Sequence, residues 1–131
     1  MNQKKYSYAF LTLLLAILTC NAKAEWGMFA DPDEFTHYLD DRKTRTGNLS
    51  KIWELTDYNT PQTGAGGKMY WSEKMQTEFN CVDKQRRVLY SSIHAEKMGE
   101  GKPIHEDLSP GKWESVAPES TYKYILDFAC R

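Results

Sequence analysis

Apolar and polar side chains alternate along residues 68–81, and this pattern predicts one long β-strand that ends at a cysteine. The odd-numbered positions are mostly apolar and include Met69, Trp71, Met75, Phe79 and Cys81. The even-numbered positions between them are polar: Ser72, Lys74, Gln76, Glu78 and Asn80. Since successive side chains of a strand point to opposite faces, we expect the odd-numbered face to be buried and the polar face to meet solvent.

Shorter strands are expected before the long one. Residues 26–30 form an apolar segment that ends at Asp31, Pro32 and Asp33, and residues 35–39 form a second strand that ends at a turn over residues 40–43.

A third strand is expected over residues 49–58, after a turn at residues 47–48. It carries apolar side chains on both faces, with Trp53 and Leu55 on one and Ile52 and Tyr58 on the other. Such a strand is typical of the centre of a sheet. Residues 59–67 then have the composition of a mobile loop.

Two further strands and a helix are expected after Cys81. Residues 87–95 follow a tight connection, so they should pair with the long strand as a hairpin, and Pro103 places a last strand over residues 102–108 at an edge. A helix should begin at Pro118-Glu119, because apolar residues then recur at helical spacing. They are Tyr122, Ile125, Leu126 and Ala129. The fold class is therefore α+β, a single antiparallel sheet of about six strands covered by a C-terminal helix.

Residues 1–24 have the features of a signal peptide. Two lysines, an apolar run over residues 9–18 and the small residues of Ala22-Lys23-Ala24 follow in order, which predicts cleavage between Ala24 and Glu25. The run is shorter than the about 20 residues that span a bilayer, so no membrane span is expected. The mature domain, residues 25–131, is then periplasmic or secreted. An alternative is lipidation of Cys20, which would make the protein an outer-membrane lipoprotein.

Removal of the signal peptide changes both the charge and the cysteine count. The formal charge of −1 becomes −4, because Lys4, Lys5 and Lys23 are lost, and an acidic domain gives no reason to expect nucleic acid as a partner. Two cysteines remain, Cys81 and Cys130, and in an oxidising compartment they most simply form one disulfide that ties the helix to the sheet.

No motif indicates a cofactor. Residues 64–68 are rich in glycine but lack the spacing of a phosphate loop and precede a strand. His94 and His105 would face each other across a hairpin if the turn at residues 98–101 had a two-residue tip, but no third metal ligand is evident, so a solvated histidine pair is expected. The aspartates at residues 31, 33, 40 and 41 are expected to form turns and not to bind calcium.

No motif indicates an enzyme either, since no serine lies in a nucleophile elbow and the cysteines have a structural role. We therefore expect no catalytic, cofactor or metal residues. The tryptophans are expected mostly in the core, while one left exposed beside residues 59–67 would anchor a partner. They are Trp26, Trp53, Trp71 and Trp113.

A series of short features along residues 25–131 resembles the surface-adhesin protein E family of Gram-negative bacteria. In order they are a tryptophan-led first strand, Tyr38-Leu39-Asp40, residues 52–58, an aromatic-Trp-Ser strand ending at Phe79-Asn80-Cys81, residues 86–89, residues 98–101, Trp113 with Pro118-Glu119-Ser120, and a terminal cysteine. The resemblance implies a sheet of about six strands with a disulfide-tied helix. It also implies an extracytoplasmic protein that binds macromolecules, in the best-known members host matrix and plasma proteins. That adhesin is a lipoprotein, whereas this signal favours ordinary cleavage.

From these observations we expect a small exported binding protein without a cofactor, adhesin-like, whose partner is a protein or other macromolecule recognised through the sheet face and loops. The acidic charge would favour basic partner surfaces. The alternative is an inhibitor of an extracytoplasmic enzyme such as a cell-wall lytic enzyme.

Overall fold

A computed structural model describes residues 25–131, so the predicted signal peptide, its Ala24-Glu25 cleavage site and Cys20 lie outside or at the border of the described residues. The elements are β1 (Trp26–Ala30), β2 (Phe35–Asp40), β3 (Thr44–Thr46), β4 (Leu49–Thr63), η1 (Ala65–Gly67), β5 (Met69–Asn80), β6 (Gln85–His94), η2 (Lys97–Gly99), β7 (Pro103–Asp107), β8 (Glu114–Ser115) and α1 (Thr121–Ala129). Within residues 25–131 no helix is long and apolar enough to cross a membrane.

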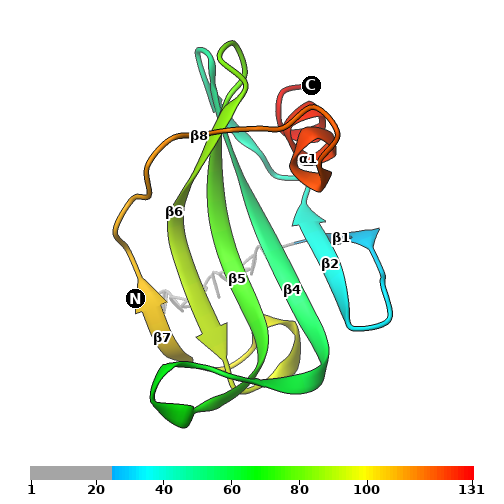
Figure 1. Cartoon of the computed structure of the whole chain (residues 1–131), viewed down its shortest axis with the longest axis vertical. Coiled ribbons are helices and arrows are strands. Elements are labelled where there is room, and N and C mark those ends of the chain that lie inside the picture. Colours follow the sequence, from blue (N-terminus) through cyan, green and yellow to red (C-terminus); the bar gives the residue numbers. More distant parts are fainter. Residues whose placement is uncertain (1–24) are drawn as a thin grey trace, which may run out of the picture.

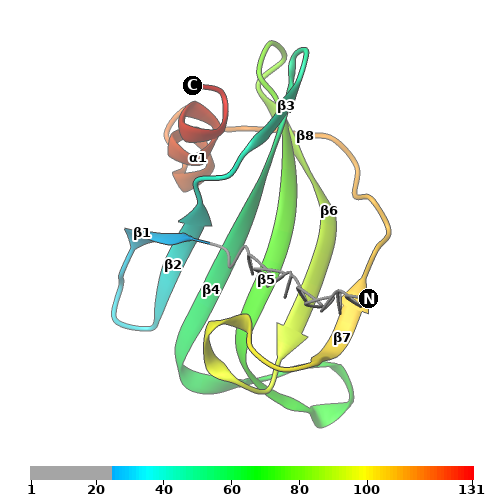
Figure 2. The ribbon, with the colours of Figure 1, turned by 180° about the vertical axis from the view of Figure 1, so that it is seen from behind.

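The sheet is antiparallel and follows the order of the chain. Six strands lie side by side in the order β1-β2-β4-β5-β6-β7, while the short strands β3 and β8 pair with β4 and β6 (Figure 1). The expected sheet is confirmed, with β4 central and Pro103 on the edge strand β7. Figure 2 shows the same twisted strands from behind.

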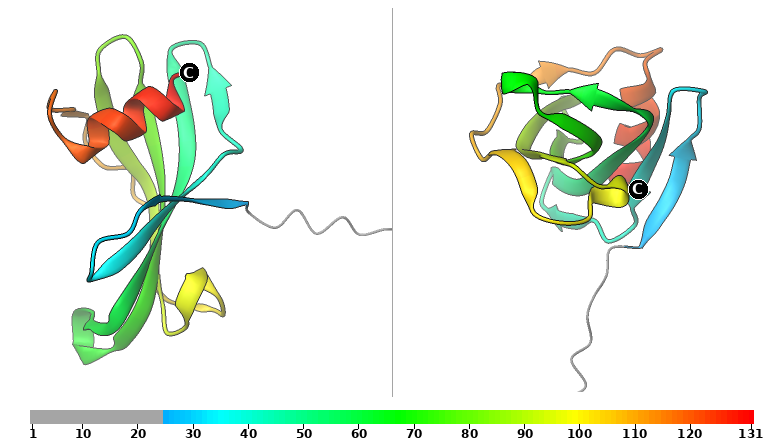
Figure 3. Two further views of the ribbon diagram at one scale, coloured as in Figure 1. Left: turned by 90° about the vertical axis from the view of Figure 1, so that its right-hand side faces the viewer. Right: turned by 90° about the horizontal axis from the view of Figure 1, so that it is seen from below.

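Helix α1 covers one end of one sheet face (Figure 3). Ile125, Leu126 and Ala129 pack there with Leu39, Ile52 and Phe79, and these side chains form the buried core. The helix begins at Thr121, three residues later than Pro118, because Ser120 is still extended and its hydroxyl donates to the carbonyl oxygen of Ala117 at 2.8 Å. The amphipathic pattern located the helix, but Pro118 and Glu119 belong to the turn that precedes it.

The C-terminal end of α1 is fixed to the sheet by covalent and polar contacts. Cys81 and Cys130 form the expected disulfide, with their Cα atoms 5.7 Å apart. The hydroxyl of Ser50 donates to the carbonyl oxygen of Ala129 at 2.6 Å, and Lys43 Nζ donates to that of Phe128 at 2.7 Å. These donors satisfy carbonyl groups that the end of a helix leaves without partners.

The expected loop over residues 59–67 is wrong over its first half. Strand β4 continues to Thr63 beyond an irregularity between Asp57 and Gln62, and Gln62 pairs with Tyr70 of β5. Only the turn around η1 is left. Met69, predicted to face inward, is 51% exposed because it lies beside this turn, at the end of the hairpin.

The expectation that the even-numbered face of β5 meets solvent is also wrong. Residues 95–101 fold over this face, where the hydroxyl of Ser72 accepts a hydrogen bond from the Gly99 amide at 2.8 Å. Gly99 suits the contact, because its φ is +65° and an added Cβ would lie 2.7 Å from the Lys74 side chain. Glu78 is buried on the same face beside Arg87, whose nitrogen lies 2.7 Å away. Both faces of the central sheet are thus partly covered.

Candidate functional site

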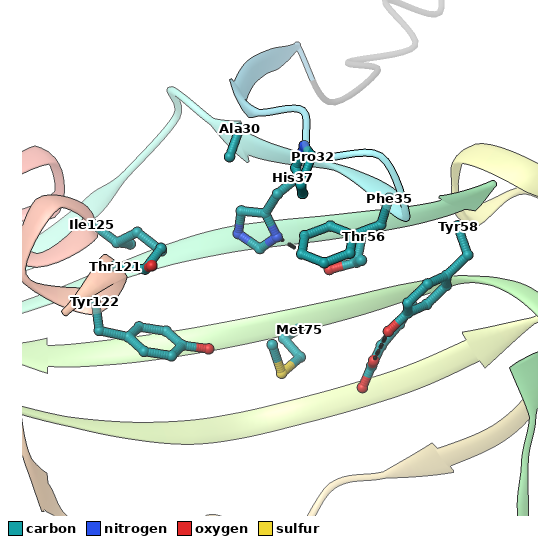
Figure 4. Close-up of a pocket in the computed structure, with 11 residues that line it drawn as sticks. Ala30, Pro32, Phe35, His37, Thr56, Tyr58, Met75, Thr121, Tyr122 and Ile125 are labelled. Atoms are coloured by element: carbon teal, nitrogen blue, oxygen red, sulfur yellow. Dashed lines mark hydrogen bonds between the residues drawn. The ribbon is translucent and has the colours of Figure 1, made fainter.

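A hollow of about 490 Å³ lies on the face that α1 only partly covers. Its size falls in the range of pockets that bind small molecules or single side chains. The lining residues come from the β1–β2 hairpin, β4, β5 and α1: Ala30, Pro32, Phe35, His37, Thr56, Tyr58, Glu73, Met75, Thr121, Tyr122 and Ile125. Figure 4 shows Tyr122 reaching in from the helix at one end, Tyr58 at the other and Met75 between them.

Strand register brings these side chains together. His37 of β2 pairs with Thr56 of β4, which in turn pairs with Glu73 of β5, so the three side chains stand in a row on one face. The next row on the same face contains Phe35 and Tyr58. Because directly paired residues of antiparallel strands share a face, the row follows from the register alone.

A buried imidazole and a buried carboxylate lie at the base of the site. His37 is 9% exposed and Glu54 is 1% exposed, and His37 Nε2 lies 3.2 Å from Glu54 Oε2. The two atoms form an ion pair if the imidazole is protonated, but they make no hydrogen bond with each other or with any other group among residues 25–131. The remaining polar atoms are satisfied, since His37 Nδ1 is 3.1 Å from the Thr56 hydroxyl oxygen and the Thr77 hydroxyl donates to Glu54 Oε1. One nitrogen of His37 and one oxygen of Glu54 are therefore still able to form hydrogen bonds beside the hollow.

Glu73 is a carboxylate in the wall of the hollow. Burial, with a smaller contribution from the negative charge of Glu54, raises the pKa of Glu73, while a hydrogen bond from Tyr58 opposes the shift. That hydroxyl lies 3.4 Å from Glu73 Oε2. None of the ion pairs within the described part of the chain includes Glu73, and the lining contains no lysine or arginine. The hollow is thus polar on one side without a cation.

Aromatic rings surround this carboxylate. Phe35 and Tyr58 meet edge to face with ring centroids 6.2 Å apart, and Tyr70 meets Tyr58 at 5.7 Å. Burial raises the pKa of Tyr58 and of Tyr122 above the ordinary value of a phenol, so both hydroxyls stay neutral at physiological pH. They therefore offer hydrogen bonds and ring faces, but no charge.

The row of Thr56, His37 and Glu54 places a hydroxyl, an imidazole and a carboxylate in sequence, as in hydrolytic triads. Acyl transfer also needs backbone N–H groups that point at the developing oxyanion. Thr56 lies in mid-strand, and β4 is paired on both sides there, with His37 and with Glu73. This arrangement favours binding over catalysis.

The two histidines singled out from the sequence do not meet. His94 pairs with Pro103 while His105 pairs with Ile93, so the two side chains fall on opposite faces. His94 is 2% exposed, and its Nε2 lies 2.9 Å from the Ser92 hydroxyl. Burial lowers the pKa of His94. The expected solvated pair is wrong because residues 95–101 form a covering segment instead of a tight turn. Separately, residues 25–131 contain no cluster of three or more side chains suited to a metal.

The tryptophans also depart from expectation. All four are half-buried and none belongs to the core cluster. Lys97 lies 4.9 Å from the ring centre of Trp71, and Arg87 lies 4.5 Å from that of Trp113. Trp71, which is close to residues 59–67 in the sequence, is thus half-buried with a lysine over its ring, and no tryptophan among residues 25–131 is fully exposed as a partner anchor.

Sequence reasoning missed the hollow. One available signal was Glu73, which interrupts the apolar positions of β5 between Trp71 and Met75. Glu54 similarly lies between Ile52 and Thr56 on the inward-facing positions of β4. An acidic residue on a buried face calls for a partner or a function.

Two solved structures share this fold. The structure of Haemophilus influenzae protein E matches with a TM-score of 0.58 and 12% identity, over 80% of this chain and 92% of that one. Protein E from non-typeable Haemophilus influenzae matches with a TM-score of 0.57 and 13% identity, over 82% and 85%. At such identities the likeness shows the fold alone. No curated protein sequence matches this chain.

The family model described as surface-adhesin protein E matches residues 26–131. This match includes the whole sheet, the disulfide and α1. The chain belongs to the surface-adhesin protein E family.

Proposed function

We propose that this chain is an exported, adhesin-like binding protein that recognises a macromolecular ligand through the hollow between α1, the β1–β2 hairpin and the central strands. The observation that carries the proposal is an open pocket of about 490 Å³ that combines aromatic side chains with a carboxylate lacking a cation. Membership of an adhesin family supports binding as the task. The predicted signal peptide supports a periplasmic or secreted location.

The hollow has the composition of a binding hot spot. Aromatic side chains such as Phe35, Tyr58 and Tyr122 supply contact area at a small entropic cost, and Met75 adapts to the shape of a partner. The wall is rigid on one side because Thr56 of β4 is paired with both His37 of β2 and Glu73 of β5. Preorganisation of this kind strengthens binding.

Saturable binding tests the proposal. Purified residues 25–131 with the disulfide intact would be titrated onto immobilised matrix and serum proteins, and the apparent Kd measured. Replacement of Ala30 by Phe fills the hollow from β1 and should weaken binding at least about tenfold, the loss expected when one hot-spot contact is removed. Replacement of Met28 by Phe adds a ring on the same strand outside the hollow, where Met28 is 64% exposed, and should change nothing.

If the Ala30→Phe and Met28→Phe variants bind the ligand equally well, the assignment of the hollow as the binding site is refuted. Loss of a lytic enzyme's activity at a stoichiometric amount of the protein, with no binding to matrix or serum proteins, would refute the adhesin-like role in favour of an inhibitor.

A further inference from the structure

The hollow has a wall charge that no side chain of the described part of the chain neutralises. Glu73 contributes a carboxylate in the wall and Glu54 a second one behind it, and the imidazole of His37 is the one titratable base in the lining. Burying a carboxylate without a cation is unfavourable, and the fold tolerates this cost beside an open pocket. A positively charged group that enters the hollow would neutralise the carboxylate and so remove this cost.

We infer that the hollow receives one cationic side chain of the ligand, a lysine ammonium or an arginine guanidinium, which pairs with Glu73 against the aromatic wall. The inference rests on the proposed function and adds to it the chemistry of the ligand.

The aromatic wall suits a cation as well as the carboxylate does. Ring faces attract ammonium and guanidinium groups that lie within about 6 Å of the ring centre. This chain already uses the contact. At the edge of the hollow the guanidinium of Arg86, which is not part of the lining, lies 3.6 Å from the ring centre of Tyr122, and elsewhere Lys43 Nζ lies 4.7 Å from that of Phe128. Inside the hollow, Phe35 and Tyr58 have no such partner among residues 25–131.

A second observation concerns the base of the hollow. His37 lines the hollow and is nine-tenths buried, yet its Nε2 and the facing Oε2 of Glu54 make no hydrogen bond. Buried polar atoms without partners are rare in native structures and call for an explanation. A bound cation close to Glu73 would bring N–H donors into a region that the free protein leaves unsatisfied.

The shape and lining exclude other ligand classes. An anionic ligand would meet the carboxylate of Glu73, with Glu54 buried behind it, and no lysine or arginine in the lining. A purely apolar ligand would desolvate Glu73 further without compensating its charge. Lysine and arginine carry apolar stems, which would lie along Met75 and Ile125 while the charged end reaches Glu73.

Small probes test the inference independently of any macromolecule. Residues 25–131 with the disulfide intact would be titrated with the N-acetyl methylamides of lysine, arginine and norleucine, and binding followed by NMR of the Met75 and Ile125 methyl groups. The norleucine probe is the neutral control of similar length. We expect the cationic probes to shift both methyl signals, with at least about tenfold weaker binding of norleucine, as a charge-assisted contact requires.

Replacement of Glu73 by Gln keeps the shape of the side chain and removes its charge, so binding of the cationic probes should fall at least about tenfold. Replacement of Glu119 by Gln removes the same charge from an exposed position outside the hollow and should leave binding unchanged. Equal binding of norleucine and lysine, or an E73Q variant that binds like the unaltered protein, would overturn the inference.

The two proposals fail in different ways. If A30F abolishes binding of the macromolecule while E73Q has no effect on either the probes or the macromolecule, the binding role stands and the cationic ligand is wrong. If the cationic probes bind and depend on Glu73 while the macromolecule binds A30F normally, the cation site stands and the adhesin-like use of the hollow is wrong.

Discussion

Removal of the disulfide should lower the free energy of unfolding by about 2–4 kcal/mol. Cys81 and Cys130 are 49 residues apart in the sequence, and closing a loop of that length restricts the unfolded chain by about 4 kcal/mol on the chain-entropy relation. Residual structure in the unfolded chain makes this an upper value. Since small domains are stable by only about 5–15 kcal/mol, the bond supplies a large share of the total.

The folded state should nevertheless survive the loss. Ile125, Leu126 and Ala129 remain buried against the sheet, and Ser50 still donates to the carbonyl oxygen of Ala129. A variant with alanine at both Cys81 and Cys130 should therefore keep α1 docked. Its Tm should fall by about 8–32 °C, because 1 kcal/mol corresponds to about 4–8 °C in a domain of this size.

Urea unfolding of residues 25–131 at pH 7, followed by far-UV circular dichroism, measures the difference. Val82 lies next to Cys81 and is exposed, so its replacement by Ala is a matched control that should change stability by less than about 0.5 kcal/mol. A double-alanine variant that also stays within about 0.5 kcal/mol of the parent would refute the reasoning, since the crosslink would then restrict nothing.

Three further predictions concern single groups. Ser50→Ala leaves a buried carbonyl of Ala129 without its donor and should cost about 1–3 kcal/mol in urea unfolding, with no change in disulfide content. Glu73→Gln should raise the free energy of unfolding at pH 7, because the raised pKa of Glu73 means that its ionised form is destabilising in the folded state; the gain should disappear as the pH falls through the raised value towards 4.5. The exported protein should have the intact mass of a chain beginning at Glu25, and a lipid-modified mass beginning at Cys20 would contradict this.

The local pattern was sufficient for the six main strands, the helix and their order, although it did not predict the short strands β3 and β8. Alternation identified β5 and its neighbours, helical spacing identified α1, and Pro103 placed β7 at the edge. Two cysteines in an exported chain predicted the disulfide. These features follow from short-range rules, since side chains alternate along a strand and recur every three or four residues along a helix.

Boundaries and coverage were less predictable. Proline and polar residues over 59–63 favour a loop, but pairing with the start of β5 holds the end of this segment in β4. The polar face of β5 predicts solvent exposure, yet residues 95–101 cover Ser72 and donate a backbone N–H to its hydroxyl. No local sequence pattern predicts this contact. The same segment buries His94 and separates it from His105.

The sequence by itself determined that this is an α+β chain with an inward and an outward face to its long strand and two cysteines available to tie helix to sheet. Only the tertiary structure decided where the helix stops covering that face, and therefore where a hollow is left. It also decided that Glu73 lies in the wall of this hollow beside Tyr58. The physical reason is that strand register aligns residues far apart in the chain: Thr56 stands between His37 and Glu73 because backbone hydrogen bonds between strands fix the pairing, and a single sequence read along its length does not contain those distances.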